Sequence, residues 1–117
     1  MLHHLSLPVA NIERSTRLYD VALLALGYRR VCSSQDFSGY GIEDDKDQFA
    51  IKKIDPATSA GPGFHLALSA PSQEAVDKFH EAAILMGATD NGPPWTRSTI
   101  WGQLLRGFYY RSGWIPY

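Results

Sequence analysis

The stretch His65-Leu66-Ala67-Leu68-Ser69-Ala70-Pro71-Ser72 decides the fold, because it repeats a pattern that the chain has already used once. Residues 4–11 read His4-Leu5-Ser6-Leu7-Pro8-Val9-Ala10-Asn11, at a constant offset of 61 residues (65 − 4 = 61). Each stretch ends on a good helix N-cap, Asn11 or Ser72. Each copy then closes on a glycine, Gly27 or Gly87, after one residue of slippage. Strand, cap, helix and glycine stop recur in the same order, which predicts two copies of one module.

The alternation inside the repeat separates an apolar face from a polar one. Successive side chains of a strand point to opposite faces, so alternate residues share a face. The apolar set is Leu5, Leu7 and Val9 in the first copy, and Leu66, Leu68 and Ala70 in the second. His4 and His65 fall on the opposite face, at the same place in each copy. Two equivalent imidazoles on one concave sheet are a candidate metal or ligand site.

Composition excludes several classes of function. The chain has 117 residues and a formal net charge of −1, with 44% hydrophobic residues, which suits one domain with an ordinary core. Its interspersed charges give no electrostatic reason to expect a nucleic acid or a membrane surface as partner. No apolar run approaches the roughly 20 residues that a membrane span needs. The N-terminus lacks the pattern of a signal peptide, and Cys32 is the only cysteine, expected as a buried thiol. We therefore expect a cytoplasmic protein with a small-molecule ligand.

The hydrophobic periodicity and the positions of glycine and proline predict one α+β domain, residues 1–117, made of two modules. Module one (1–54) reads as a strand over 2–9, a helix over 12–26 and strands over 28–33, 37–42 and 48–54, with an acidic hairpin tip at 43–47. In the first helix the buried stripe is expected to be Leu18, Val21, Ala22 and Ala25. A Pro/Gly-rich linker covers 55–63. Module two (64–117) has a helix over 73–86, after which the sequence shows no clear strand pattern. One strand fits within 100–111, and the tail shows one or two of the three strands required. The second module is thus expected to be incomplete at its C-terminal end.

Two β-α-β-β-β modules that each open on a strand with a histidine resemble the vicinal oxygen chelate superfamily. That group includes glyoxalase I, extradiol dioxygenases, fosfomycin-resistance transferases and bleomycin-resistance proteins. The resemblance is carried by residues 4–9, 18–28 and 63–68, and by 74–80, which look like the second helix of the glyoxalase-like branch. It covers roughly residues 1–94. It implies the glyoxalase/bleomycin-resistance/dioxygenase fold, two modules in pseudo-twofold arrangement, and leaves the reaction open.

The resemblance also implies a set of metal ligands, of which this chain matches two. In metal-dependent members the first strand of each module supplies one ligand and the last strand another, often glutamate. His4 and His65 match the first-strand positions. The third ligand should fall near residues 50–52, where the sequence has no good ligand, and the fourth has no recognisable counterpart in the tail. A divalent Zn, Ni, Fe or Mn is the cofactor that the resemblance implies, and whether this chain binds one stays open.

Two functions from different classes follow. The first is metal-assisted lyase or isomerase chemistry of the glyoxalase I type, or extradiol-type dioxygenase chemistry, on a small oxygen-bearing substrate; its catalytic base is unknown. The alternative is a non-catalytic binding protein that sequesters a small molecule without metal, as bleomycin-resistance proteins do. The paired histidines favour the first and the missing ligands favour the second. A homodimer is expected in both cases, because open curved sheets leave edges that a second copy can cover.

Other polar residues are expected to have simpler roles. His3 should point to the opposite face from His4, and His80 should occupy a surface or helix-packing position. Glu43 could reach a pocket but is expected at the surface. Lys52 and Lys53 alternate, so one of them should look into the cup.

The tail generates a prediction about the gene. The superfamily's usual ending resembles an apolar strand, an Asp-Pro-Asp-Gly turn and a final strand with the metal glutamate, whereas residues 106–117 read Arg-Gly-Phe-Tyr-Tyr-Arg-Ser-Gly-Trp-Ile-Pro-Tyr. Shifting the frame by one nucleotide, with suitable synonymous codons, gives Ala-Ala-Phe-Ile-Ile-Asp-Pro-Asp-Gly-Tyr-Arg. The glycine in that string is forced, because tryptophan has a single codon and every isoleucine codon begins with A.

We therefore expect an insertion or deletion near Trp95 that removed the closing strand and its metal carboxylate. Sequencing the gene and its nearest homologues tests this expectation. Codons incompatible with Asp-Pro-Asp-Gly in the neighbouring frame would contradict it. If the codons agree, restoring the frame should restore stoichiometric metal.

Overall fold

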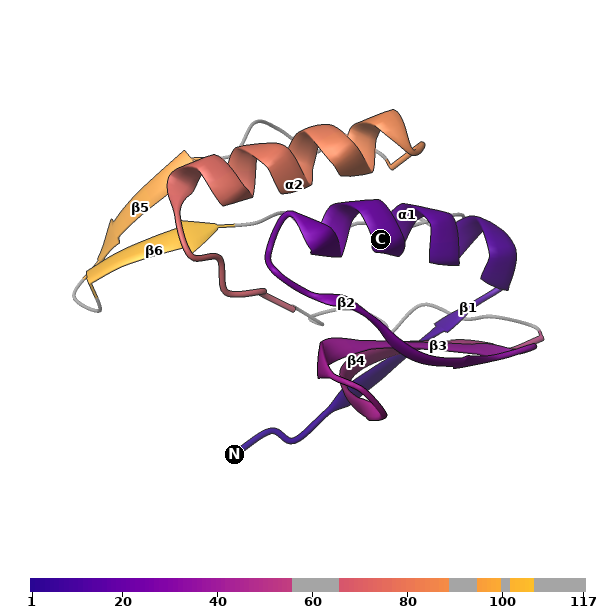
Figure 1. Cartoon of the computed structure of the whole chain (residues 1–117). Coiled ribbons are helices and arrows are strands. Elements are labelled where there is room, and N and C mark those ends of the chain that lie inside the picture. The colour runs from indigo at the N-terminus through magenta and orange to yellow at the C-terminus, as the bar shows by residue number, and fades with distance from the viewer. Residues whose placement is uncertain (56–65, 89–94, 100–101, 107–117) are drawn as a thin grey trace.

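The first half of the chain folds as a complete β-α-β-β-β module in the computed structural model, which describes residues 1–55, 66–88, 95–99 and 102–106. In order, the elements are β1 (Leu5–Val9), α1 (Ile12–Leu24), β2 (Arg29–Ser34), β3 (Phe37–Glu43), β4 (Lys46–Lys53), α2 (Gln73–Leu85), β5 (Trp95–Thr99) and β6 (Gly102–Arg106). Figure 1 shows α1 lying over one face of the sheet, with α2 running alongside α1. The predicted α+β class and the element order of the first module are confirmed.

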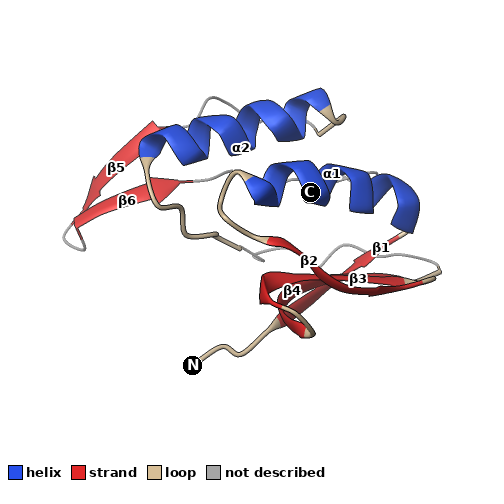
Figure 2. Ribbon diagram, viewed as in Figure 1, coloured by secondary structure: helices blue, strands red, loops and turns tan. Residues whose placement is uncertain are grey.

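The sheet has the strand order β1-β4-β3-β2 (Figure 2). β1 pairs with β4 in parallel, with Leu7 opposite Ile51, and the other two pairs are antiparallel. Parallel neighbours require a crossover, whereas antiparallel strands can be joined by tight turns. The helix between β1 and β2 and the two hairpins after it therefore account for the connectivity of the whole sheet.

Both predicted helix starts and both glycine stops are confirmed. The Asn11 side chain accepts a hydrogen bond from the Arg14 amide at 3.0 Å, and Ser72 accepts one from the Ala75 amide at 3.1 Å. Such caps satisfy amides that have no partner inside the helix. Gly27 and Gly87 have φ of 90° and 99°, a left-handed conformation that glycine adopts without strain. The helices end at Leu24 and Leu85, slightly before the predicted residues 26 and 86.

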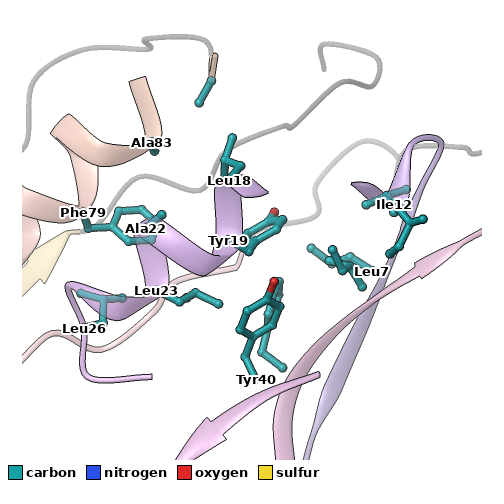
Figure 3. Packing of buried hydrophobic residues seen from close by; sticks show 14 of the residues in the cluster. Leu7, Ile12, Leu18, Tyr19, Ala22, Leu23, Leu26, Tyr40, Phe79 and Ala83 are labelled. Carbon is teal, nitrogen blue, oxygen red and sulfur yellow. The ribbon is translucent and has the colours of Figure 1, made fainter. Parts of the chain in front are cut away.

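One hydrophobic core joins the sheet, α1 and α2, as Figure 3 shows. The two helices contribute a shared set of buried residues: Ile12, Leu18, Tyr19, Ala22, Leu23, Ala75, Val76, Phe79 and Ala83. Val21 was predicted to belong to the buried stripe of α1, and this is wrong, since its side chain is 41% exposed. The buried residues of α1 recur at intervals of three and four residues from Ile12, and Val21 lies off that line. None of the helices in the described ranges is long and apolar enough to cross a membrane.

The second copy departs from the prediction in its strands. Residues 66–70 keep the expected alternation, since Leu66, Leu68 and Ala70 are half-buried against the core, but they form no strand. An alternating pattern indicates which side chains face the core, whereas a strand also needs backbone hydrogen bonds to a neighbouring strand. In the tail, β5 and β6 pair antiparallel as a separate two-stranded sheet; β6 is the strand predicted within 100–111, and β5 is a strand that the sequence did not indicate. Residues 56–65 and 107–117, which include His65 and the tail sequence with the proposed frame change, lie outside the described residues.

Tyr40 of β3 ties the sheet to α1. Its ring is fully buried and packs beside Tyr19 and Phe49 at centroid distances of 6.3 Å each. Its hydroxyl lies 3.0 Å from a carboxylate oxygen of Asp20 and 3.2 Å from the carbonyl oxygen of Thr16. The other carboxylate oxygen of Asp20 lies 3.3 Å from the Arg30 guanidinium. Burial, and then the neighbouring negative charge of Asp20, raise the pKa of Tyr40 far above its ordinary value.

The raised pKa of Tyr40 predicts a loss of stability in alkali. Below about pH 10 the phenol is neutral in both the folded and the unfolded state, so it adds no pH dependence there. Above that pH the unfolded chain ionises at this residue while the folded chain does not, and stability falls by up to about 1.4 kcal/mol per pH unit. Tyr40→Phe should abolish this part of the slope, and should cost about 1–2 kcal/mol at neutral pH because Asp20 loses a donor.

Urea unfolding of both proteins at neutral pH and at several alkaline pH values measures this difference. Tyr28→Phe is the matched control, because Tyr28 is half-buried and takes no part in the hydrogen bonds of Tyr40. An alkaline slope in Tyr40→Phe equal to that of the wild-type protein would contradict the prediction.

Candidate functional site

The candidate site is the face of the sheet that points away from α1, which we call the open face. Because side chains alternate along each strand, the residues in register across the sheet form two rows on this face. One row is Ser6, Ala50, Gly39 and Cys32, and the next is Pro8, Lys52, Phe37 and Ser34. Ser6, Lys52 and Ser34 are exposed, Pro8, Phe37 and Cys32 are half-buried, and Ala50 and Gly39 are buried. Leu7, Val9, Phe49 and Ile51 point the other way, into the core.

The first row (Ser6, Ala50, Gly39 and Cys32), which we call the floor of the open face, consists of small residues. Gly39 has no room for a larger residue, because an added Cβ would lie 2.6 Å from the Cys32 Sγ and 2.8 Å from the Asp47 Cβ. Burial, followed by the charges of Asp47 and Asp45, raises the pKa of the Cys32 thiol. The thiol therefore stays protonated at neutral pH and is a poor nucleophile. Cys32 was expected to be buried, and it is instead half-buried on this face.

The second row carries a positive charge on an apolar base. The Lys52 ammonium lies 5.9 Å from the centroid of the Phe37 ring, within the range of a cation–π contact. Lys52 is exposed and, within the part of the chain that the structure describes, forms no ion pair. Of the two lysines predicted to alternate here, Lys52 faces the site and Lys53 does not. The third metal ligand was expected near residues 50–52, and the residues that the sheet presents there are Ala50 and Lys52.

His4 lies at the end of the open face, just before β1. It is exposed, and its Nδ1 lies 2.9 Å from the Nδ1 of His3, with the two rings edge to face. The expectation that His3 points away from His4 is therefore wrong. The strand was predicted to begin at residue 2 but begins at Leu5, so the alternation of a strand does not apply to residues 3 and 4.

A surface hollow of about 580 Å³ adjoins His4, between the N-terminal residues 2–4 and the β3–β4 hairpin. Glu43 lines this hollow, but its carboxylate is exposed and pairs with the Lys46 ammonium at 2.6 Å. Asp45 and Asp47 lie in the same lining. These acids surround the hollow as a solvated hairpin tip, which agrees with the sequence-based expectation for this segment. His80 is half-buried on α2, far along the chain from this face, as expected for a helix-packing position.

The donor set of the described residues does not fit a chelated divalent metal. Such a centre usually takes three protein ligands and an open position. Nowhere in the described ranges do three His, Cys, Asp or Glu side chains come together to hold an ion. The pairing of His4 with His65 stays a prediction, because His65 lies outside those ranges.

Solved structures of known proteins share the fold of this chain. No family model matches the sequence, and no curated protein matches it. Among solved structures, a glyoxalase/bleomycin resistance protein from Albidiferax ferrireducens is similar with a TM-score of 0.72 and 28% identity, over 86% of this chain and 82% of that one. A glyoxalase/bleomycin resistance protein/dioxygenase family enzyme from Burkholderia phytofirmans has a TM-score of 0.59 and 20% identity, over 86% and 83%. A hypothetical protein from S. aureus has a TM-score of 0.55 and 18% identity, over 81% and 77%.

These similarities confirm the predicted resemblance to the vicinal oxygen chelate superfamily. The mixed α+β structure, with its four-stranded sheet and two helices, matches the glyoxalase/bleomycin-resistance fold. The two structures at 18% and 20% identity show the fold alone. The structure at 28% identity supports the superfamily and leaves the activity of this chain open.

Sequence reasoning proposed His4 as a site residue and expected either Lys52 or Lys53 to face the site, but it missed the two rows of the open face. The signal was present, because the hairpin turn at 44–45 and the alternation of β4 together fix which residues stand opposite each other. The crowding of Cys32 and Asp47 around Gly39 had no such signal. It depends on the register shift between Tyr40 and Gly41, which moves Asp47 beside the floor.

The tight approach at Gly39 predicts a cost for any side chain there. Gly39→Ala should destabilise the fold by about 1–3 kcal/mol, because Cys32 and Asp47 must move to admit the methyl group. The cost should be smaller in a Cys32→Ala background, where one of the two close contacts is gone. Thermal or urea unfolding of the single and double variants measures both effects, with exposed Ser34→Ala as the control. A Gly39→Ala variant as stable as the wild-type protein would contradict the close packing of this floor.

Proposed function

We propose that this protein binds a small oxygen-bearing molecule on the open face without a chelated metal. The observation that carries the proposal is Lys52, an exposed cation at the place on β4 where the superfamily resemblance implies a metal carboxylate. An ammonium cannot ligate a metal while it keeps its proton, and its charge opposes a second cation beside it.

The rows of the open face supply what a small ligand needs. In the first row Ser6 is exposed, whereas Ala50 and Gly39 are buried, so a ligand would reach this face along Ser6 and the second row. Pro8 and Phe37 offer apolar surface on the strands that flank Lys52, and the hydroxyls of Ser6 and Ser34 can donate or accept hydrogen bonds. Mostly apolar sites with a few placed polar groups are typical of small-molecule binding. We place the ligand on this face, with His4 at its edge.

Metal-assisted catalysis is the second candidate. It is favoured by the position of His4 at the start of β1 and by the resemblance to a structure described as a dioxygenase family enzyme. If a metal were bound, His4 and the equivalent His65 would be its first two ligands, and a divalent ion there would polarise oxygens of the ligand. The reaction would be of the lyase, isomerase or dioxygenase type.

Metal content separates the two candidates. Protein purified without a histidine tag, exposed to Zn²⁺, Ni²⁺, Mn²⁺ or anaerobic Fe²⁺ and then desalted, should retain far less than one ion per chain. Elemental analysis by inductively coupled plasma mass spectrometry measures this directly. One ion per chain that is lost in His4→Ala would overturn the proposal and establish the metal centre.

A carboxylate at residue 52 should reverse the preference. Lys52→Glu replaces the opposing charge with a metal ligand, so it should retain more Zn²⁺ or Ni²⁺ than the wild-type protein. Lys53→Glu makes the same change in charge on a neighbouring residue that does not face the site, and it should have no such effect. Equal retention by the two variants would show that residue 52 does not control metal binding.

A further inference from the structure

We infer that the ligand of the open face is a small flat carboxylate, held by the Lys52 ammonium and stacked against Phe37; this inference rests on the proposed function. Its basis is the chemistry of the second row, in which one cation stands between two apolar rings. Lys52 is in register with Pro8 on β1 and with Phe37 on β3. The row therefore has a positive centre and hydrophobic flanks.

The charge of Lys52 is available to a ligand. Its ammonium lies 5.9 Å from the centroid of the Phe37 ring, and its side chain is exposed. Asp36 lies in the adjoining β2–β3 turn, where its carbonyl accepts a hydrogen bond from the Lys53 amide at 2.8 Å. The ion pairs found in the described residues do not include one between Asp36 and Lys52.

Asp47 lies too far away to neutralise Lys52. Asp47 is the acid that reaches the floor, and it is five residues before Lys52 on β4. At a rise of about 3.3 Å per residue this corresponds to roughly 16 Å along the strand. That distance is about twice the Debye length at physiological ionic strength, so the two charges are largely screened from each other. Asp47 therefore does little to oppose the binding of an anion at Lys52.

The flanking groups decide the shape of the anion. Phe37 and Pro8 present flat apolar surfaces, and Ser34 stands next to Phe37 with an exposed hydroxyl. A planar ring can stack on Phe37 while its carboxylate reaches the Lys52 ammonium, and a hydroxyl can donate to the same carboxylate. A single ammonium suits one negative charge. A polyanion such as nucleic acid would need a row of cations, which the described face does not have.

Benzoate and its neutral isostere benzamide test the inference. Each is titrated at constant ionic strength into the isotopically labelled full-length chain, and backbone and Lys52 side-chain NMR shifts are followed. Benzoate should give saturable shifts centred on Lys52 and Phe37, with an affinity at least several-fold above that of benzamide. Lys52→Gln should lower the affinity for benzoate to the level of benzamide, whereas Lys52→Arg should keep most of it.

Lys53→Gln is the matched control, because it removes the same charge from the adjacent residue and leaves the open face unchanged. Phe37→Leu should weaken both probes, since it removes the stacking surface and not the charge. Heteronuclear spectra of each variant establish that it is folded.

Two results would overturn the inference and are distinguishable from failure of the proposed function. In the first, benzamide binds as tightly as benzoate, or Lys52→Gln changes the affinity for neither probe. The open face then binds small molecules without using the charge of Lys52, and the proposed function stands. If benzoate shifts no residue of the second row, the carboxylate is excluded. The proposed function is then decided by the metal content of the purified chain, which does not depend on either probe.

Discussion

The parallel pairing of β1 with β4 is the constraint on which the rest of the structure depends. It places the first and last strands of the module side by side, so the chain after β1 must pass to the far edge of the sheet. α1, which joins β1 to β2, makes this crossing and covers one face of the sheet. The same pairing fixes the facing of every side chain in these two strands. Leu7 stands opposite Ile51 on the helix side, and Ser6 stands opposite Ala50 on the other. A slip of one residue would exchange the two faces and bury Lys52 under α1.

The covered face carries most of the buried side chains of the sheet. Tyr40 illustrates this, because its buried ring packs against two aromatic neighbours and its hydroxyl is held by groups of α1. The nearby hydroxyls of Thr16 and Ser38 lie 2.8 Å apart, so the buried Ser38 also has a partner on the helix. Buried polar groups that find partners cost little, whereas unpaired ones are expensive. The seam between α1 and the sheet therefore combines apolar packing with satisfied polar contacts, which makes it a rigid support for the open face.

Local sequence signals predicted the ends of the helices well, but they predicted the pairing of strands poorly. The caps at Asn11 and Ser72 and the stops at Gly27 and Gly87 each depend on a few neighbouring residues, so the sequence specified them completely. Residues 66–70 show the limit. Their alternating pattern predicts which side chains approach the core, but strand formation requires a partner that the pattern does not name. β5 was missed for the opposite reason, because its sequence carries little alternation and the strand is defined by its pairing with β6.

The candidate site was predicted in the same uneven way. The repeat indicated His4, and the alternation of β4 indicated that Lys52 or Lys53 would face it. The contact between His3 and His4 was missed because it depends on where β1 begins, and strand ends are the least certain part of any pattern. The row of Pro8, Lys52 and Phe37 needed the register of three strands at once. The β3–β4 turn indicates which residues of those two strands stand opposite each other, but β1 pairs with β4 in parallel and no tight turn sets that register.

The separation of the two faces explains how such a fold can keep its architecture while its site changes. Core residues of β4, Phe49 and Ile51, contact α1 and its neighbours, and replacing them would open cavities. Lys52, between solvent and the Phe37 ring, contributes little to that packing. A change at residue 52 from a carboxylate to an ammonium therefore alters the charge presented to a ligand without disturbing the core. Because the fold constrains the inward residues and leaves the outward ones free, resemblance in structure carries over to this chain more securely than resemblance in chemistry.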